Sequence, residues 1–218
     1  MVKVACGHAH SVCVDHQGRI FTWGCGNYGC LGNKEQRDSF LPIMLSIQGG
    51  ERNKCPPDCV VAAGSTSTFV SAQQGQLYYC GKIKTSGDNA MALKPFTDLS
   101  GWTCRSFTAG PATFGCSASD GGGGGGSSIT WGAAHCGELG VPDKKTSAAP
   151  VKVPALEGML VSHVACGNGF TAFLVDKEAD SSKLPVWNPP KDVAGGDAEA
   201  GAKRKAPAGA SAASKKSK

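Results

Sequence analysis

The chain contains 218 residues, of which 18% are charged and 40% are hydrophobic. This composition excludes a coiled coil and a charge-rich disordered protein, and it leaves room for a packed core. The formal net charge is +5, but residues 1–176 are almost neutral because the excess of Lys and Arg lies in residues 177–218. A neutral body gives no support for a nucleic-acid groove, which needs clustered cations.

Glycine is unusually frequent, with 31 residues, and aromatic residues make up only 7%. This mixture predicts an all-β fold of short strands and tight turns. No apolar run is long enough to cross a membrane, so we expect no membrane insertion. The 11 cysteines are an odd number scattered along the chain, which favours free thiols in a reducing compartment.

The first predicted element is a short strand that ends in glycine, Val4-Ala5-Cys6-Gly7, and it returns three times. The later copies end at Gly64, more loosely at Gly110, and at Gly167. An apolar run follows each glycine after a short polar step, which predicts the second strand of a hairpin. These second strands are expected at residues 11–14, 68–70, 114–116 and 171–175.

A further strand closed by glycine follows in three copies, at residues 18–24, 75–81 and 128–132. Trp23 and Trp131 occupy matching places on two of these strands, where large rings suit packing between neighbouring sheets. The motif Gly-x-Leu-Gly then appears in the first and third copies, at residues 29–32 and 137–140. Pro42 and Pro150 each open a fourth strand, at residues 42–45 and 150–153.

One unit therefore contains four short strands in roughly 50 residues, which is typical of a β-propeller blade. We predict about three blades and a fraction of a fourth, in units covering approximately residues 1–58, 59–104, 105–160 and 161–176. Residues that recur at corresponding places are predicted to be structural, because tight turns need positive φ and close backbone approach excludes a Cβ atom. They are Gly7, Gly64, Gly110, Gly167, Trp23, Gly24, Gly81, Trp131 and Gly132.

Two stretches resemble the repeat of the regulator of chromosome condensation family: Val-Ala-Cys-Gly-x-x-His-Ser at 4–11 and Phe-Thr-Trp-Gly-x-Gly-x-x-Gly-x-Leu-Gly at 21–32. The match covers about residues 1–176. Residues 101–106, the repeat motifs near 130–140 and the ending at 183–189 are similar to the carboxyl-terminal half of the family's second member. The resemblance implies a seven-bladed propeller, of which this chain would supply the C-terminal half.

Two motifs suggest ligand chemistry but have simpler explanations. Gly24–Gly29 fits G-x-G-x-x-G after a strand, but a dinucleotide site needs a helix to begin there, and the next residues are poor helix starters. We interpret this motif as a turn. Candidate zinc ligands do not form the paired set of four that a structural site needs; they are Cys25 and Cys30, Cys55 and Cys59, and His8, His10 and His16 near Cys13.

The sequence offers no Ser–His–acid constellation and no G-x-S-x-G motif. We therefore predict that the chain is not an enzyme and has no catalytic residue, no cofactor and no metal. His10 matches the repeat histidine of the family, and the resemblance implies a structural role for it.

Residues 177–218 are predicted to be a disordered basic tail, because Ala, Gly, Lys, Ser and Pro dominate them from Pro189 onward and cannot bury enough surface. Two cationic clusters resemble a bipartite nuclear-import signal; they contain Lys203, Arg204, Lys205, Lys215, Lys216 and Lys218. The alternative is a tail that binds nucleic acid or other polyanions without specificity.

The resemblance implies a non-catalytic interaction module whose partners are a small GTPase of the Rac or Ran type, chromatin, spindle components and a nuclear-import receptor. It implies a nuclear location, at the nucleolus or on mitotic chromosomes or the spindle, with a cytoplasmic pool. Two alternatives stay open. One is a guanine-nucleotide exchange factor, although nothing here matches the wedge of the family's founding member. The other is a truncated fragment without independent function, whose open sheet faces cause self-association.

Overall fold

The computed structural model describes residues 3–47, 55–72, 75–84, 87–119, 126–142, 146–176, 184 and 186. The chain divides into two compact units, Met1–Leu184 and Pro185–Lys218, and every strand described below belongs to the first. The predicted basic tail lies outside the described residues apart from two isolated positions, and so do all six residues of the predicted import signal.

The described strands form three four-stranded antiparallel sheets and one two-stranded sheet. The first sheet contains β1 (Lys3–Cys6), β2 (His10–Val14), β3 (Ile20–Gly24) and β4 (Ser39–Leu45). The second contains β5 (Val61–Ala63), β6 (Ser67–Ser71), β7 (Leu77–Gly81) and β8 (Ala90–Pro95). The third contains β9 (Thr103–Ala109), β10 (Thr113–Ser119), β11 (Ser127–Ala133) and β12 (Thr146–Lys152). The fourth contains β13 (Val161–Cys166) and β14 (Thr171–Val175).

Short 3-10 helices occur in the connections, at η1 (Asn27–Gly29), η4 (Thr97–Leu99) and η5 (Pro154–Leu156). No helix in the described part of the chain is long and apolar enough to cross a membrane.

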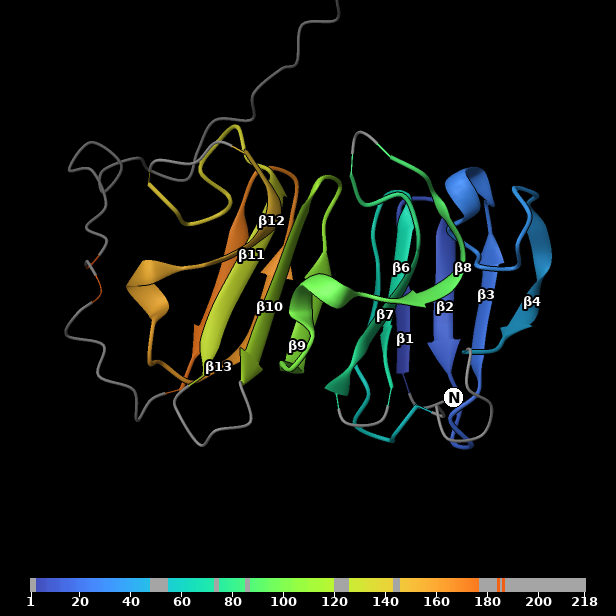
Figure 1. Ribbon diagram of the computed structural model, residues 1–218, viewed down its shortest axis with the longest axis horizontal. Coiled ribbons are helices and arrows are strands. Elements are labelled where there is room, and N and C mark those ends of the chain that lie inside the picture. The colour runs from blue at the N-terminus through green and yellow to red at the C-terminus, as the bar shows by residue number, and fades with distance from the viewer. Residues whose placement is uncertain are drawn as a thin grey trace, which may run out of the picture. The chain divides into compact units, whose positions relative to one another are not determined.

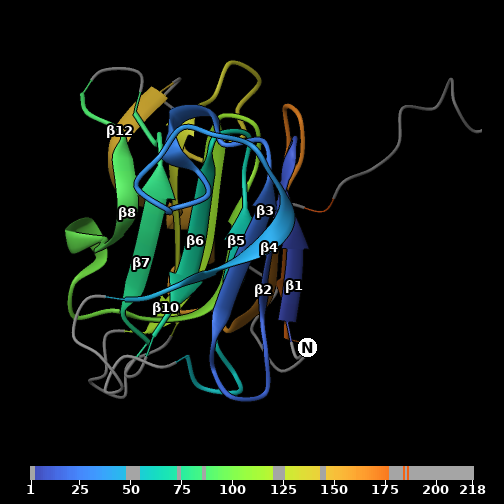
Figure 2. The ribbon, with the colours of Figure 1, turned by 90° about the vertical axis from the view of Figure 1, so that its right-hand side faces the viewer.

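The sheets follow one another in chain order across the first unit (Figure 1), and strands of the first and second sheets run side by side (Figure 2). The first strand of each sheet contacts the first strand of the next: β1 contacts β5, β5 contacts β9, and β9 contacts β13. Antiparallel four-stranded sheets that meet through their innermost strands are the arrangement of propeller blades. The predicted all-β partial propeller is confirmed.

The core lies in layers between the sheets. Successive side chains on a strand point to opposite faces, so a strand of a middle sheet serves two cores. On β6, Val70 packs in the core between the first and second sheets, whereas Phe69 packs in the core between the second and third. The second core is aromatic: the ring of Trp131 stacks 5.3 Å from that of Phe96 and 5.5 Å from that of Phe114.

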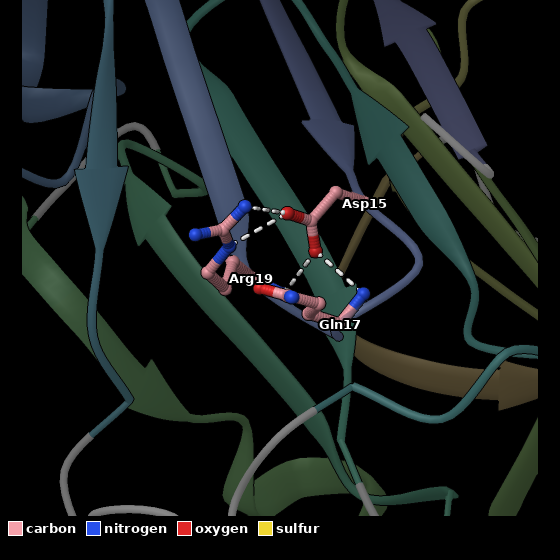
Figure 3. A network of polar contacts seen from close by, with 3 residues as sticks. All are labelled: Asp15, Gln17 and Arg19. Carbon is pink, nitrogen blue, oxygen red and sulfur yellow. Dashed lines mark hydrogen bonds and ion pairs between the residues drawn. The ribbon is translucent and has the colours of Figure 1, made fainter.

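The hairpin turn between β2 and β3 is held by Asp15 (Figure 3). Its Oδ1 atom accepts hydrogen bonds of 2.9 Å from the backbone N–H groups of Gln17 and Arg19, and its Oδ2 atom lies 2.6 Å from the Arg19 guanidinium. Desolvation opposes ionisation, but these contacts, with those to Arg19 the largest, outweigh it and lower the pKa of Asp15 to about 2. The carboxylate therefore fixes the turn that sets the register of the first sheet.

Candidate functional site

The glycines that end the first strand of each unit gather around one hollow of about 280 Å³. In each hairpin the glycine N–H donates to the carbonyl oxygen three residues later, with N···O distances of 2.8 Å for Gly7, Gly64 and Gly110 and 2.9 Å for Gly167. The same turn is thus built four times, although the accepting residues are His10, Ser67, Thr113 and Phe170. What repeats is therefore the backbone hydrogen bond, and the side chain of the accepting residue differs in each unit.

Close packing of neighbouring turns explains the choice of glycine. A Cβ atom placed on Gly7 would lie 2.2 Å from the carbonyl oxygen of Gly64, well inside van der Waals contact. The N–H of His8 donates to the same oxygen at 3.1 Å. The first and second sheets therefore touch through their backbones, and the wall of the hollow at this point is made of peptide groups.

A second set of glycines closes the third strand of each complete unit. Gly132 has φ of +111°, and a Cβ atom there would lie 2.1 Å from the carbonyl oxygen of Ala112. Gly24 and Gly81 also have positive φ and face the corresponding carbonyl oxygens. In all three units the next N–H donates to that oxygen, as from Ala133 to Ala112 at 2.9 Å. At these positions the strand is therefore in close backbone contact with the turn before the second strand of the same sheet.

Trp23 and Trp131 occupy the same place in their sheets but differ in burial. Trp23 pairs with Ser11, and Trp131 pairs with Phe114, one step before the glycine that closes each strand. Trp131 is 1% exposed because the second sheet covers it, whereas Trp23 is only partly buried, on the face of the first sheet turned away from the second. Burial therefore follows the presence of a neighbouring sheet.

His10 connects the first sheet to the second. Its Nε2 atom lies 2.8 Å from Oγ1 of Thr68, and that hydroxyl donates at 2.8 Å to the carbonyl oxygen of Cys30. Because the Thr68 hydrogen is used in the second bond, His10 must be the donor in the first. The imidazole is 4% exposed, and burial lowers the pKa of His10 against a smaller opposing effect of the Ser67 backbone.

The motifs that suggested ligand chemistry lie in turns and cores. Gly26 and Gly29 belong to a connection whose helical part is only η1, with Tyr28 at φ of 60°. The Cys30 thiol donates at 3.1 Å to the Cys25 carbonyl oxygen, and burial raises the pKa of Cys30 to about 11, so this thiol is protonated.

The eleven cysteines are free thiols, including Cys55 and Cys59, which are both buried. Among the described residues, no three His, Cys, Asp or Glu side chains form a group that could hold a metal ion.

The pattern of the sequence did not reveal a cleft of about 340 Å³ between the second and third sheets. Phe114 and Trp131 line it from the third sheet, and Lys82 and Lys84 line it from the connection after β7. The Nζ atom of Lys84 lies 3.5 Å from Oδ2 of Asp98, whereas that of Lys82 lies 5.2 Å from the centre of the Tyr28 ring.

One polar group beside this cleft is unsatisfied. Within the described residues the indole N–H of Trp131 has no hydrogen-bond partner, although the side chain is almost fully buried. A buried N–H without a partner costs about 1–3 kcal/mol, so an added acceptor would be favourable. Ser65 and Pro111 line both this cleft and the glycine-lined hollow, so the two form one recessed surface.

Comparison with known proteins agrees with the repeat. Two models described as the regulator of chromosome condensation (RCC1) repeat match the chain, one at residues 17–71 and 126–174 and the other at residues 1–30. The chain is 34% identical to the protein RCC2 homolog of Xenopus laevis over 194 residues, covering 85% of this chain and 36% of that protein. It is 32% identical to human protein RCC2 over 199 residues, covering 85% of this chain and 35% of that protein. The chain therefore spans about a third of the length of these relatives.

Solved structures share the fold at low sequence identity. Human WBSCR16 has a TM-score of 0.65 and 20% identity, with 80% of this chain and 45% of that chain covered. Prp20p of Saccharomyces cerevisiae, characterised together with its binding to Gsp1p and histones, has a TM-score of 0.65 and 17% identity, with 83% and 45% covered. Yeast RCC1 (Prp20), crystallised with Kap60 bound to it, has a TM-score of 0.64 and 18% identity, with 83% and 43% covered.

Proposed function

Because the chain belongs to the regulator of chromosome condensation (RCC1) repeat family, we propose that it is a non-catalytic protein-interaction module of a nuclear regulator. One observation carries this proposal. The glycine-lined hollow and the cleft between the second and third sheets share lining residues, and together they form a recessed surface across the turns of the sheets. Recessed surfaces built from rigid strands and turns suit recognition of a protein partner.

The proposed partners are a small GTPase of the Rac or Ran type, chromatin and spindle components. The binding of Prp20p to Gsp1p and histones supports the first two classes, since that protein shares the fold. The similarity to RCC2 proteins over 85% of the chain supports a regulatory role of the same kind.

A retention assay tests this function. The purified chain is immobilised and offered Rac- and Ran-type GTPases in nucleotide-free and GDP-bound forms, nucleosomes and microtubules. We expect saturable retention of at least one of these. Retention of none of them would contradict the proposed module.

Release of labelled GDP, measured with the retained GTPase, separates binding from catalysis. A non-catalytic module leaves the release rate unchanged. Acceleration of release would instead identify the chain as a guanine-nucleotide exchange factor and would contradict the non-catalytic assignment.

We further propose that the tail directs nuclear import. Lys203, Arg204 and Lys205 form one cationic cluster, and Lys215, Lys216 and Lys218 form the other. Kap60 bound to a protein of the same fold supports an import receptor as partner. A fluorescent fusion is expected in the nucleus, with a cytoplasmic pool. Alanine at one cluster or both should shift it to the cytoplasm, and unchanged nuclear accumulation would contradict the import signal.

A further inference from the structure

We infer that the cleft between the second and third sheets binds a short loop segment of a partner protein, with a leucine-type side chain next to an acidic residue. This inference rests on the proposed function as an interaction module, and it identifies the binding place and the chemistry of the bound segment. Three features carry it: an internal precedent, a shorter connection in the second unit and a complementary set of groups in the cleft.

The precedent is the neighbouring cleft, between the first and second sheets. There the connection between β3 and β4, residues 25–38, folds into the space between the sheets. Its Leu31 is fully buried, and the Oγ1 atom of Thr22 donates at 2.7 Å to the Leu31 carbonyl oxygen. From the second sheet, Thr68 and Cys80 donate to the preceding carbonyl, that of Cys30, at 2.8 and 3.2 Å. A leucine with its backbone carbonyls thus fills that cleft.

The third unit has the same arrangement of a connection with a buried leucine. Its connection, residues 134–145, also carries a Gly-x-Leu-Gly motif. Leu139 is fully buried, and Thr130 donates at 2.7 Å to its carbonyl oxygen, as Thr22 does in the first unit. The residue before the leucine is Glu138 in this copy.

The second unit lacks a connection of this kind. Its connection between β7 and β8, residues 82–89, is shorter than the other two and contains no Gly-x-Leu-Gly. The position of Thr22 and Thr130, two residues before the closing glycine, is occupied by Tyr79, whose ring packs 6.0 Å from that of Phe69. Among the described residues of this connection, 82–84 and 87–89, none is buried as Leu31 and Leu139 are, and the cleft beside the third sheet is open.

The open cleft has groups complementary to such a segment. Phe114 and Trp131 stand where Thr68 and Cys80 stand in the second sheet, because both pairs are adjacent to the closing turn in the same register. Together with Ile83 they form the apolar part of the lining, and we assign the unpaired indole N–H of Trp131 as the donor for a backbone carbonyl of the segment. Lys82 makes no ion pair among the described residues, and Lys84 shares Asp98, so the mouth favours an acidic neighbour.

The probe for this site comes from the chain itself. A fluorescein-labelled peptide with the sequence of residues 134–142, carrying Cys136→Ser to prevent oxidation, contains Gly-Glu-Leu-Gly. We expect saturable binding to the full chain in an anisotropy titration. Peptides with Leu139→Asp or Glu138→Lys should bind about tenfold more weakly, because one loses the apolar contact and the other meets Lys82 and Lys84.

Matched variants place the peptide in the cleft. Ala148→Trp puts a large ring on a residue that lines the cleft, whereas Ala149→Trp changes the adjacent exposed residue, which does not line it. Lys82→Glu with Lys84→Glu is compared with Lys94→Glu, an exposed lysine on β8 outside the cleft. The cleft variants should weaken binding at least about tenfold and the controls should leave it unchanged, with thermal melts confirming that all variants fold.

Absence of peptide binding, or binding that Ala148→Trp leaves intact, overturns the inference. Sedimentation velocity adds a further outcome: if the chain alone self-associates and Ala148→Trp abolishes this, a second copy occupies the cleft and the partner segment is wrong. The proposed function is judged separately. If GTPase, nucleosome or microtubule retention persists in the Ala148→Trp variant while the peptide fails to bind, the function stands and only the site is wrong.

Discussion

The Nε2 atom of His10 lies 2.8 Å from the Oγ1 atom of Thr68, and this contact joins two separate sheets. The Thr68 hydroxyl donates in turn to the Cys30 carbonyl oxygen, so a continuous chain of hydrogen bonds connects the first sheet, the second sheet and the connection between β3 and β4. Buried polar chains of this kind are strong only while each group keeps its required protonation state.

A pH dependence follows from the neutral imidazole. Burial lowers the pKa of His10 below its ordinary value of 6.5, so the unfolded chain binds the proton first as the pH falls. This contribution to stability is complete above pH about 6.5 and is lost below it, at up to about 1.4 kcal/mol per pH unit. Urea unfolding at pH 7.5 and 5.5 measures the loss. His10→Gln should reduce it, and His163→Gln, at an exposed site on β13, should not. An equal pH dependence in the His10→Gln variant would contradict the assignment.

The closing glycine of the third unit is expected to tolerate no side chain. Gly132→Ala combines positive φ with a clash against the Ala112 carbonyl oxygen, and it should lower the free energy of unfolding by about 2–4 kcal/mol. Gly137→Ala is the matched control, because Gly137 also has positive φ but a Cβ atom there would meet nothing within 4 Å. Its cost should be about 1 kcal/mol. Equal effects in urea unfolding would show that backbone conformation alone, and not close packing, selects glycine.

The two tryptophans should differ in their contribution to stability. Trp131→Ala removes a buried ring that stacks on Phe96 and Phe114, and it should cost about 3–5 kcal/mol. Trp23→Ala, at the corresponding place on the open face of the first sheet, should cost about 1 kcal/mol. Chemical unfolding of both variants tests this difference. Similar losses would mean that Trp23 is also covered in solution.

The open face of the first sheet predicts self-association at micromolar concentration. Phe40 is 95% exposed, and Val4 and Met44 are 60% and 61% exposed, an unusual amount of apolar surface on one sheet. Phe40→Ser with Met44→Ser should weaken self-association about tenfold in sedimentation velocity. Leu174→Ser, on the fourth sheet, distinguishes two modes of self-association. If two copies meet through their first sheets, this variant leaves the association unchanged. If the first sheet of one copy meets the fourth sheet of another, it weakens the association. A wild-type chain that stays monomeric at all concentrations contradicts the prediction.

Most of the fold was predictable from the sequence repeat, because the recurring glycines are required by the backbone conformation of the turns. Glycines that close turns recur in the sequence even where the neighbouring side chains differ, as His10 and Ser67 do. Strand limits were less accurate. β4 begins at Ser39, three residues before the Pro42 that was expected to open it. Proline is tolerated there because β4 is the last strand of its sheet and needs no N–H bond on its outer side.

The cleft was not predicted, because it depends on what is missing from one copy. The Gly-x-Leu-Gly motif is visible in the sequence of the first and third units. That its absence from the second unit leaves a cleft could be inferred only from the structure, in which Leu31 fills the space between two sheets. The unpaired N–H of Trp131 and the juxtaposition of Lys82 with the third sheet likewise depend on packing between units. Sequence distance alone does not reveal such contacts.

A loop transplant tests the central claim, that a short connection leaves a binding cleft open between the second and third sheets. Residues 82–89 are replaced by the sequence of residues 25–38, which fills the cleft between the first and second sheets. Affinity for the 134–142 peptide is measured by anisotropy, together with the melting temperature. We predict that the transplant folds with at least wild-type stability and loses peptide binding at least about tenfold. A folded transplant that binds the peptide as tightly as the wild type would contradict the account.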